Sequence, residues 1–367
     1  MPGLGYTLLV SMAPARQPVL DAVQEIEIEA SLDVASVVRV RFGIAQNETG
    51  DWNILQEDLF RPLVPLGVRI QTGVGPPEAV INGFVSAADV SYGESPGGSV
   101  LEVTAMDATT LMNLEEKVTA WPNMPDSVIA AAIFGQYGLV PKVQSTSPVL
   151  TDPEGTTIQR GTDIRFVRRL AQRNGFDCYV QPEPLSGLDI AHFEPPQTVG
   201  LPQAVLNVAM RDQTNVSDFS IRYQMLQPTT VVASGLDVPT KLPQPALAPA
   251  AALQPLGAEA ALGRIVPPPV VRPADTGLLR TAELQTAAQA IVDRSSWAIA
   301  ASGQAGPDVG VLRPGGFVNI RGLGDLYSGS YVVSSVRHSI SADGWTQRFE
   351  ARRNAVRATG AELFVGV

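Results

Sequence analysis

The sequence Gln24-Glu-Ile-Glu-Ile-Glu-Ala30 is followed closely by Val38-Arg-Val-Arg-Phe42. Both stretches alternate apolar and charged residues with a period of two, which is the pattern of a half-buried β-strand. The polar positions are glutamates in the first stretch and arginines in the second. Antiparallel pairing would set these opposite charges across from each other and would be stabilised by them, whereas two independently solvated strands would show the same pattern. In either case the stretch predicts β-structure.

More strands are expected in the first part of the chain. They are predicted at Val68–Thr72, Val80–Tyr92 and Ser99–Ala105, and the last two flank Gly93-Glu-Ser-Pro-Gly-Gly98, a strong turn signal. Residues 1–110 therefore predict one antiparallel β domain, a closed or nearly closed barrel.

Helical patterns replace the alternation in residues 111–200. The predicted elements are a helix within Pro125–Gly138 that Asp126 or Ser127 would cap, a helix over Thr162–Asn174 that Gly175 would stop, and a strand over Phe176–Val180. Cys178 falls in this strand, where we expect a buried, inert thiol. These residues predict a smaller α+β domain.

Strand patterns return in the last part of the chain. The strands are predicted at Ser217–Ala233, Gly316–Arg321, Ser330–Ser341 and Trp345–Arg353, with an amphipathic helix at Thr281–Ala298. Between them, Pro239–Asp275 holds nine prolines and few bulky apolar residues, which indicates a linker or an extended arm. We therefore predict a second β-barrel domain from residues 201–238 and 280–357, a Pro/Ala-rich arm at 239–279 and a C-terminal tail at 358–367. The predicted fold is mainly β, with two similar antiparallel barrels and an α+β insertion.

Composition excludes several classes of protein. The chain has 367 residues, 45% of them hydrophobic, and a net charge of −10. This length favours two or three domains with real cores, and the acidic charge argues against nucleic acid as a partner. The first residues lack the basic region of a secretory signal, so we expect synthesis in the cytoplasm. The longest mainly apolar stretch, Val128–Val140, is shorter than a membrane-spanning helix.

The chain offers few residues for known catalytic or metal sites. His192, His338 and Cys178 are too few for a structural zinc site. None of the three lysines follows a glycine, as a phosphate-binding loop requires. Gly322–Gly329 is glycine-rich but lies between predicted strands, which favours a hairpin turn over dinucleotide binding.

The remaining candidates are better explained by structure than by catalysis. No Gly-x-Ser-x-Gly motif accompanies either histidine, and His338 lies in an alternating strand, where a surface or cross-strand histidine is expected. The glutamates Glu25, Glu27 and Glu29 are interpreted as a solvated or salt-bridged face. We therefore predict no catalytic, cofactor-binding or metal residues and no cofactor, and expect an assembly or binding component rather than an enzyme.

Several segments together resemble one known family. They are Asp126–Leu139, Ile158–Val180, Pro314–Gly322, Ser328–His338 and Gln347–Arg353. The second resembles the helix-to-strand pattern "F-L-x-R-L-A-x-x-x-G-Y/F-x-x-Y/W-V" of phage late control D proteins and VgrG-type hubs. The last three resemble that family's closing pattern, "P-G-x-x-V-x-V-x-G … G-x-Y-x-V-x-x-V-x-H … F-x-x-x-R". With the N-terminal strands, the resemblance to these baseplate hubs covers most of the chain.

The resemblance implies a structural hub of a contractile tail or contractile injection system. Three copies of such a hub form a ring, each copy supplies two similar barrel (tube) domains, and the ring adapts a threefold spike to the sixfold tail tube and templates tube assembly. The expected partners are a homotrimer of this chain, a trimeric spike protein, the tail tube or a tube-initiator protein, and baseplate wedge proteins. VgrG-type chains carry a fused spike, whereas this chain ends at Val367 after the hub pattern, so a separate spike is expected.

Other functions and settings stay open at this point. A tail-associated cell-wall hydrolase would need paired carboxylates across a cleft, and a carbohydrate-binding β module would be unusual with four Trp and seven Tyr in the whole chain. The particle could be a phage tail, a bacteriocin or an injection system. We further expect the Pro-rich arm to lie along an adjacent subunit, and the apolar tail 361–367 to dock on the spike or a baseplate neighbour.

Overall fold

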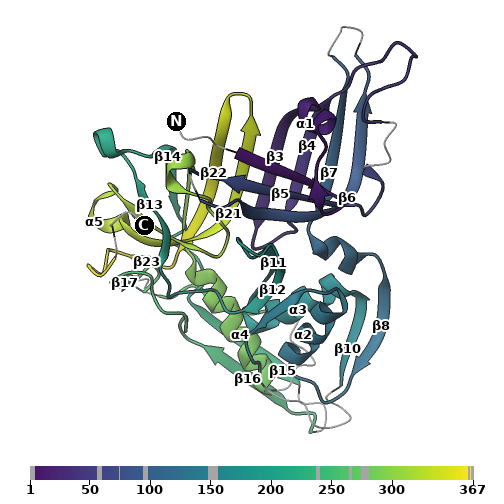
Figure 1. Cartoon of the computed structure of the whole chain (residues 1–367). Helices are drawn as coiled ribbons and strands as arrows, with labels where there is room; N and C mark the ends of the chain where they lie inside the picture. Colours follow the sequence, from purple (N-terminus) through teal and green to yellow (C-terminus); the bar gives the residue numbers. More distant parts are fainter. Residues whose placement is uncertain are drawn as a thin grey trace.

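The computed structural model describes residues 5–55, 60–73, 75–93, 98–147, 156–236, 240–263, 267–273, 281–362 and 364. Parts of the predicted Gly93–Gly98 turn, of the arm and of the C-terminal tail lie outside the described residues. The described chain is mainly β, with several antiparallel sheets and a smaller set of helices, as the sequence predicts (Figure 1).

One sheet of 13 strands joins the two ends of the chain. Its path runs β14-β19-β22-β21-β3-β4-β7-β6-β5-β1-β2, and β20 and β13 branch from β21. The first half of this sheet comprises β1 (Gly5–Val10), β2 (Ala13–Pro14), β3 (Val23–Ser31), β4 (Val37–Gly43), β5 (Pro65–Gln71), β6 (Glu78–Ser91) and β7 (Val100–Met106). The second half comprises β13 (Pro202–Asn207), β14 (Val216–Tyr223), β19 (Ile299–Ala305), β20 (Phe317–Arg321), β21 (Gly329–Ser341) and β22 (Gly344–Arg353).

Strand β3 connects the two halves because it is paired along both of its edges. On one edge it pairs with β4, which places Glu27 opposite Arg39. On the other edge it pairs with β21, which places Glu29 opposite Arg337. Arg39 donates to Glu27 at 3.0 Å, and Arg337 donates to Glu29 at 3.3 Å. The antiparallel, charge-matched pairing of the first two strands is confirmed, and the second β half supplies a further arginine.

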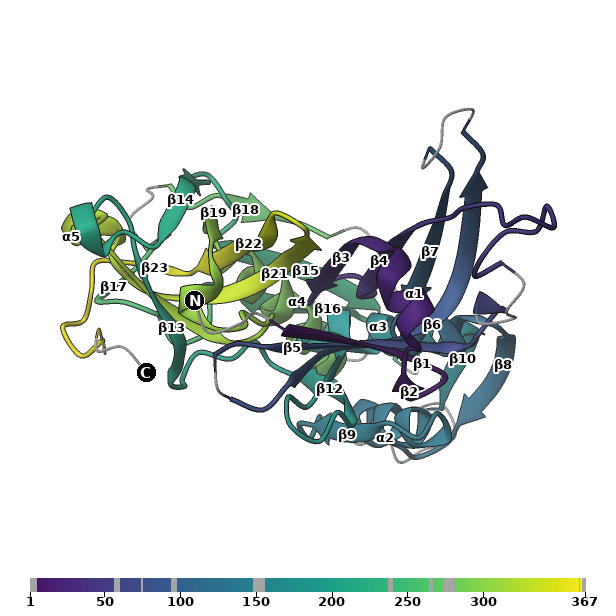
Figure 2. The same cartoon turned by 45° about the horizontal axis from the view of Figure 1, so that its top comes forward.

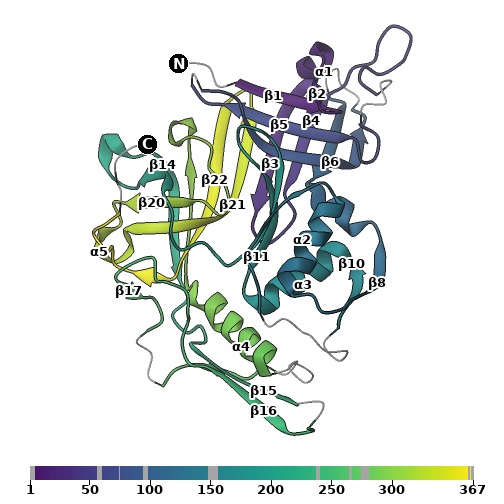
Figure 3. The same cartoon turned by 60° about the horizontal axis from the view of Figure 1, so that its bottom comes forward.

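The core of the first half lies between two layers of the same sheet. Ile26 and Ile28 are fully buried on β3. Strands β1 and β5 cross over β3 and β4 and contribute Leu8 and Val68 to the same cluster (Figure 3). A second cluster, which includes Phe349, fills the other half. Among the described strands no pairing closes either half into a barrel, so the number of barrels stays a prediction.

Each half contains one long strand that bends at a bulge. Before and after the bulge, this strand pairs with different neighbouring strands. In β6, the residues before Val85 pair with β5 and those after it pair with β7, across a shift of register. In β21, the residues before Val333 pair with β20 and those from Ser335 pair with β3, again across a shift. Such bulges bend and twist a strand. Beyond its bulge, Ser86–Ser91 of β6 is exposed and projects from the body together with β7 (Figure 2).

The α+β unit follows the first half. It comprises η2 (Ala108–Asn113), β8 (Glu116–Trp121), α2 (Asp126–Gln136), β9 (Val140–Val143), β10 (Thr157–Thr162), α3 (Asp163–Asn174), β11 (Asp177–Pro182) and β12 (Asp189–Glu194). Residues of both long helices, such as Phe134 and Leu170, share one core. Gly175 follows α3 with a φ of +70°. This left-handed conformation suits glycine and ends the helix as predicted.

The predicted cap of α2 is wrong. Pro125 occupies the N-cap position, and no side chain caps the helix. Asp126 instead accepts hydrogen bonds from Arg173 Nε and Asn174 Nδ2, both at 2.6 Å. Ser127 bonds to Thr146. Both partners of this carboxylate come from the end of α3, and one of them is a charged arginine, so the hydrogen bonds join the two helices and do not cap α2.

The Pro-rich arm pairs with strand β15 (Thr230–Leu236) of its own chain. β16 (Pro243–Ala248) and β18 (Val270–Val271) pair with β15, and α4 (Thr281–Ser296) packs on this sheet. Strand β15 and helix α4, which the sequence pattern assigns to the second β domain, share a core with β16 of the arm. Small inner side chains, such as Ala233 and Ala246, let the helix approach closely.

The remaining elements lie in connections. They are α1 (Gln17–Ala22), η4 (Arg211–Gln213), η5 (Pro307–Val309), α5 (Gly324–Tyr327), and the pair of β17 (Glu259–Ala260) with β23 (Ala355–Val356). None of the helices in the described residues has the length and apolar character needed to cross a membrane.

Replacing Ile28 by alanine should destabilise both halves together. Ile28 is fully buried, and truncation of a buried isoleucine to alanine costs about 2–5 kcal/mol. Because β3 is shared, we expect urea unfolding followed by circular dichroism and by tryptophan fluorescence to show one shifted transition. Glu27→Gln, on the partly exposed face of the same strand, should shift it by less than about 1 kcal/mol. Two transitions, one of them unshifted, would contradict the shared strand.

Candidate functional site: the junction of the three units

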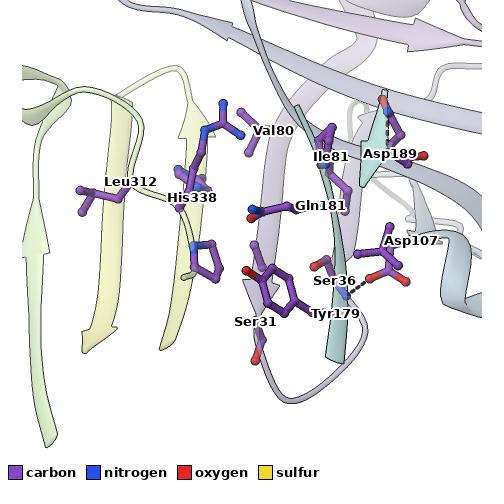
Figure 4. Close-up of a pocket in the computed structure, with 16 residues that line it drawn as sticks. Ser31, Ser36, Val80, Ile81, Asp107, Tyr179, Gln181, Asp189, Leu312 and His338 are labelled. Atoms are coloured by element: carbon purple, nitrogen blue, oxygen red, sulfur yellow. Dashed lines mark hydrogen bonds between the residues drawn. The ribbon is translucent and has the colours of Figure 1, made fainter. Parts of the chain in front are cut away.

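The two β halves and the α+β unit meet at a polar junction (Figure 4). Its walls come from β3, β6, β11, β12, β21 and the loop before β20. The residues labelled in Figure 4 are Ser31, Ser36, Val80, Ile81, Asp107, Tyr179, Gln181, Asp189, Leu312 and His338. Most of these side chains carry no charge. The three units are therefore held in position by a small number of hydrogen bonds and ion pairs.

Arg313 ties the second β half to the first. Its Nη1 donates to the carbonyl oxygen of Ala79 at 2.7 Å, and its Nη2 donates to Glu78 Oε2 at 3.0 Å. The backbone of Arg313 is held in turn by Gln203, which accepts from its N–H and donates to its carbonyl, each at 3.0 Å. The guanidinium is therefore positioned by its own half before it reaches the other.

Asn82 ties the first β half to the α+β unit. Its Nδ2 donates to Asp189 Oδ1 at 2.9 Å and to the carbonyl of Gly187 at 2.8 Å. Nearby, the backbone N–H of Ala79 donates to the carbonyl of Pro184 at 2.8 Å. Burial raises the pKa of Asp189 to about 6, although the Asn82 bond opposes the shift. The charged form of this carboxyl is therefore costly in the folded protein at neutral pH.

Two further carboxylates hold segments at this junction and next to it. Asp107 accepts from the backbone N–H groups of Ser36 and Thr109, at 2.6 and 2.9 Å, and fixes the turn before β4. Burial raises the pKa of Asp107. Asp177 accepts from Arg352 Nη2 at 2.7 Å, which joins β11 to β22. Each pair of units is thus linked by at least one directional bond.

His338 is buried at the centre of the sheet. Its ring stacks on Trp345 with centroids 5.9 Å apart. Burial, helped by the positive charge of Arg313, lowers the pKa of His338 to about 3. The side chain is therefore neutral at physiological pH. It lies in a cross-strand position, one of the two placements that the sequence predicts for it, and not on the surface.

The other candidates from the sequence are scattered. His192 stacks on Tyr179 at 4.3 Å, and its Nδ1 bonds Glu194 at 2.8 Å. Cys178 is buried as predicted, and burial raises the pKa of its thiol to about 12. Gly322–Gly329 connects the antiparallel pair β20–β21. Among the described residues no three His, Cys, Asp or Glu side chains gather as a metal site.

A family model decides what this architecture is. The model of the phage tail baseplate hub (GPD) family matches residues 62–344. The chain belongs to this family. Its members are structural components of the tail, so the hub carries out a structural role in a baseplate. No curated protein is significantly similar to it in sequence.

Solved structures share the fold of this hub. The tail protein from Neisseria meningitidis is 15% identical, has a TM-score of 0.66, and the match covers 98% of this chain and 100% of that one. A component of the E. coli type VI secretion system is 12% identical, with a TM-score of 0.55, and the match covers 92% of this chain and 76% of that one. A chain of the Francisella PdpA–VgrG complex is 10% identical, with a TM-score of 0.54, and the match covers 98% of this chain and 59% of that one. At these identities the likeness concerns the fold.

Sequence reasoning missed the residues that hold the junction of the hub. Arg313, Asn82 and Asp189 belong to no catalytic or ligand-binding motif. One signal was present, because Asn82 interrupts the apolar run Ala79–Val85 and a polar residue in a buried strand needs a hydrogen-bond partner. The hydrogen bonds and ion pairs of the junction connect the three units to one another. The junction therefore serves to hold the units in position.

Asp189→Asn should stabilise the hub at neutral pH. The folded pKa of Asp189, about 6, lies above its ordinary value of 3.8, so the folded state binds the proton more readily than the unfolded state. The free energy of unfolding therefore falls as the pH rises from 3.8 to 6, and the full cost is present at pH 7. The variant removes this cost and keeps an oxygen for Asn82. After allowance for solvent, we expect a gain of about 1–2 kcal/mol at pH 7 that disappears near pH 4. Urea unfolding at both pH values measures it, with the exposed Asp212→Asn as control; an equal gain at both would contradict the assignment.

His338 should have the opposite effect on acid stability. Its folded pKa of about 3 lies below the ordinary 6.5, so the unfolded chain binds the proton more readily and stability falls as the pH drops below 6.5. The contribution reaches about 3 kcal/mol at pH 4. His338→Leu should therefore lose less stability than the wild type between pH 7 and pH 4 in urea titrations. If the wild type and His338→Leu lose the same unfolding free energy between pH 7 and pH 4, the assignment is wrong.

Proposed function

We propose that three copies of this chain form the central ring of a baseplate, which adapts a threefold spike to a sixfold tail tube. The observation that carries this proposal is the hub-family match over residues 62–344. Closed threefold symmetry joins one surface of each copy to a complementary surface of the next and leaves no such interface surface unpaired.

The internal likeness of the two β halves supports a pseudo-sixfold ring. Each half has a long strand, β6 or β21, that bends at a bulge and changes neighbour. A trimer that carries two such halves per chain presents six related β units to a hexameric tube. The division into two tube domains is therefore part of the proposal, with β15, β16, β18 and α4 outside the second domain.

The partners follow from the family. A hub joins three kinds of partner. A spike protein binds one side of the ring, the tail tube or its initiator binds the other side, and baseplate wedge proteins surround the ring. The fold shared with a chain of the Francisella PdpA–VgrG complex and with the E. coli secretion component supports this set. It is compatible with a phage tail and with an injection system.

The arm supplies a candidate contact between copies. The strands β15, β16 and β18 contain no charged residue, and their outer face exposes 40% of Leu236, 55% of Leu247 and 42% of Val270. An exposed apolar sheet face of this kind is typical of a protein interface. We propose that this face packs on the adjacent subunit, so that the arm is ordered by its own helix α4 on one side and by a neighbour on the other.

Leu247→Glu should weaken the trimer without unfolding the arm. The backbone N–H and carbonyl of Leu247 stay bonded to Gln285, at 3.3 and 2.9 Å, while a carboxylate in the interface weakens association by about tenfold or more. Mass photometry and light scattering over a concentration series measure the change. Leu326→Glu, a similarly exposed site on α5, is the control. A wild-type chain that stays monomeric would overturn the ring, whereas an unaffected trimer of Leu247→Glu would overturn only this contact.

A further inference from the structure

A cavity of about 430 Å³ lies where α3, α4, β11 and the arm meet. It shares no lining residue with the polar junction. Among its lining residues are Arg168, Arg294, Arg352 and Trp297, which all carry N–H donors. Its volume falls within the range of small-molecule sites.

Arg168 has no acceptor among the described residues. Its Nε and Nη2 atoms are shielded from solvent and make no hydrogen bond. On the walls of the same cavity, the indole Nε1 of Trp297 and the Nε of Arg352 also lack an acceptor within the described part of the chain. Arg352 stacks over the Trp297 ring at 4.7 Å, which keeps the two groups together. Donors that lack acceptors therefore collect around one space.

Arg353 shows how the same chain satisfies a buried guanidinium. It is fully buried and donates to the carbonyl oxygens of Leu256, Tyr327, Ser328 and Arg357 at 2.9–3.2 Å. A desolvated cation without such acceptors is strongly unfavourable. Arg168 is half-buried and its charge interacts with the Asp107 carboxyl, but its Nε and Nη2 have no such acceptor among the described residues, which leaves these two donors available to a ligand.

The acidic side chains of the cavity do not supply that acceptor. Asp177 accepts from Arg352 at 2.7 Å. Asp293 accepts from the backbone N–H of Ala252 at 2.6 Å and from Gln289 at 3.0 Å. Asp33 is exposed. Because these acids repel a free anion, a ligand must gain more from directed hydrogen bonds than from net charge.

We propose that this cavity binds an oxyanion, a carboxylate or phosphate group, with Arg168 as its principal ligand. A guanidinium presents planar paired donors that match the two oxygens of such a group. Arg294, exposed at the same cavity, adds positive charge. The walls belong to α3, to α4 and, through Arg352, to β22, so the bound anion ties the α+β unit to the arm layer and to the second β half. This site does not depend on the proposed ring.

The test compares phosphate with acetate on the full chain. Each anion is titrated against chloride at constant ionic strength, and binding is followed by calorimetry and thermal unfolding. We expect one of them, at about 10 mM, to raise Tm by about 2 °C or more. Tighter binding of phosphate identifies a phosphoryl ligand, and tighter binding of acetate identifies a carboxylate such as an acidic side chain of a partner.

Variants on one helix separate this site from a structural role. Arg168→Met should weaken anion binding about tenfold or more. Because this variant also removes the positive charge that interacts with the buried Asp107, the Tm of each variant in chloride is measured first and the anion-induced shift is taken relative to it. Arg168→Lys keeps the charge without the planar fork and should bind with intermediate affinity. Arg165→Met, whose side chain is 68% exposed on the same helix, is the matched control. The proposal fails if neither anion binds the wild type, or if both Arg168 variants bind as tightly as the control.

Discussion

The two-sided pairing of β3 is the constraint on which the rest of the structure depends. Glu29 on this strand reaches Arg337, 308 positions further along the chain, so the first and last segments form one sheet. Without β21, one edge of β3 would leave its N–H and C=O groups unpaired. The shared strand also fixes the separation of the two β halves. The α+β unit can then be locked between them by single residues such as Asn82 and Arg352.

Elements with strong local patterns could be predicted from the sequence. Alternation over Gln24–Ala30 predicts β3 and its charged face, and the stop at Gly175 predicts the end of α3. Helix α4 and part of β15 are predicted from the sequence, but strand β16 and its place in their layer are not, because β16 is short, contains two prolines and packs through small side chains that leave no periodic signal. The cap of α2 failed for a related reason: the partner of Asp126 is 47 positions away.

The junction shows the same limit at the level of single residues. His338 shares its face of β21 with Val336 and Ile340, which are both buried, so strict alternation predicts its burial as well. Asn82 carries the signal of a polar residue in an apolar strand. Arg313 carries none, because it lies in a loop and its acceptor, the carbonyl of Ala79, is 234 positions away. Only the tertiary fold brings these groups together.

The arm shows how a segment with few large side chains can be ordered at all. Folding opposes the conformational entropy of the backbone and of the side chains. Proline is already restricted in the unfolded chain, and alanine has almost no side-chain freedom to lose. β16, Pro243-Gln-Pro-Ala-Leu-Ala248, consists mostly of these two residue types. Its ordering therefore costs less entropy than that of an average strand, and the modest contacts of Ala246 and Ala248 within the α4 layer are enough to hold it.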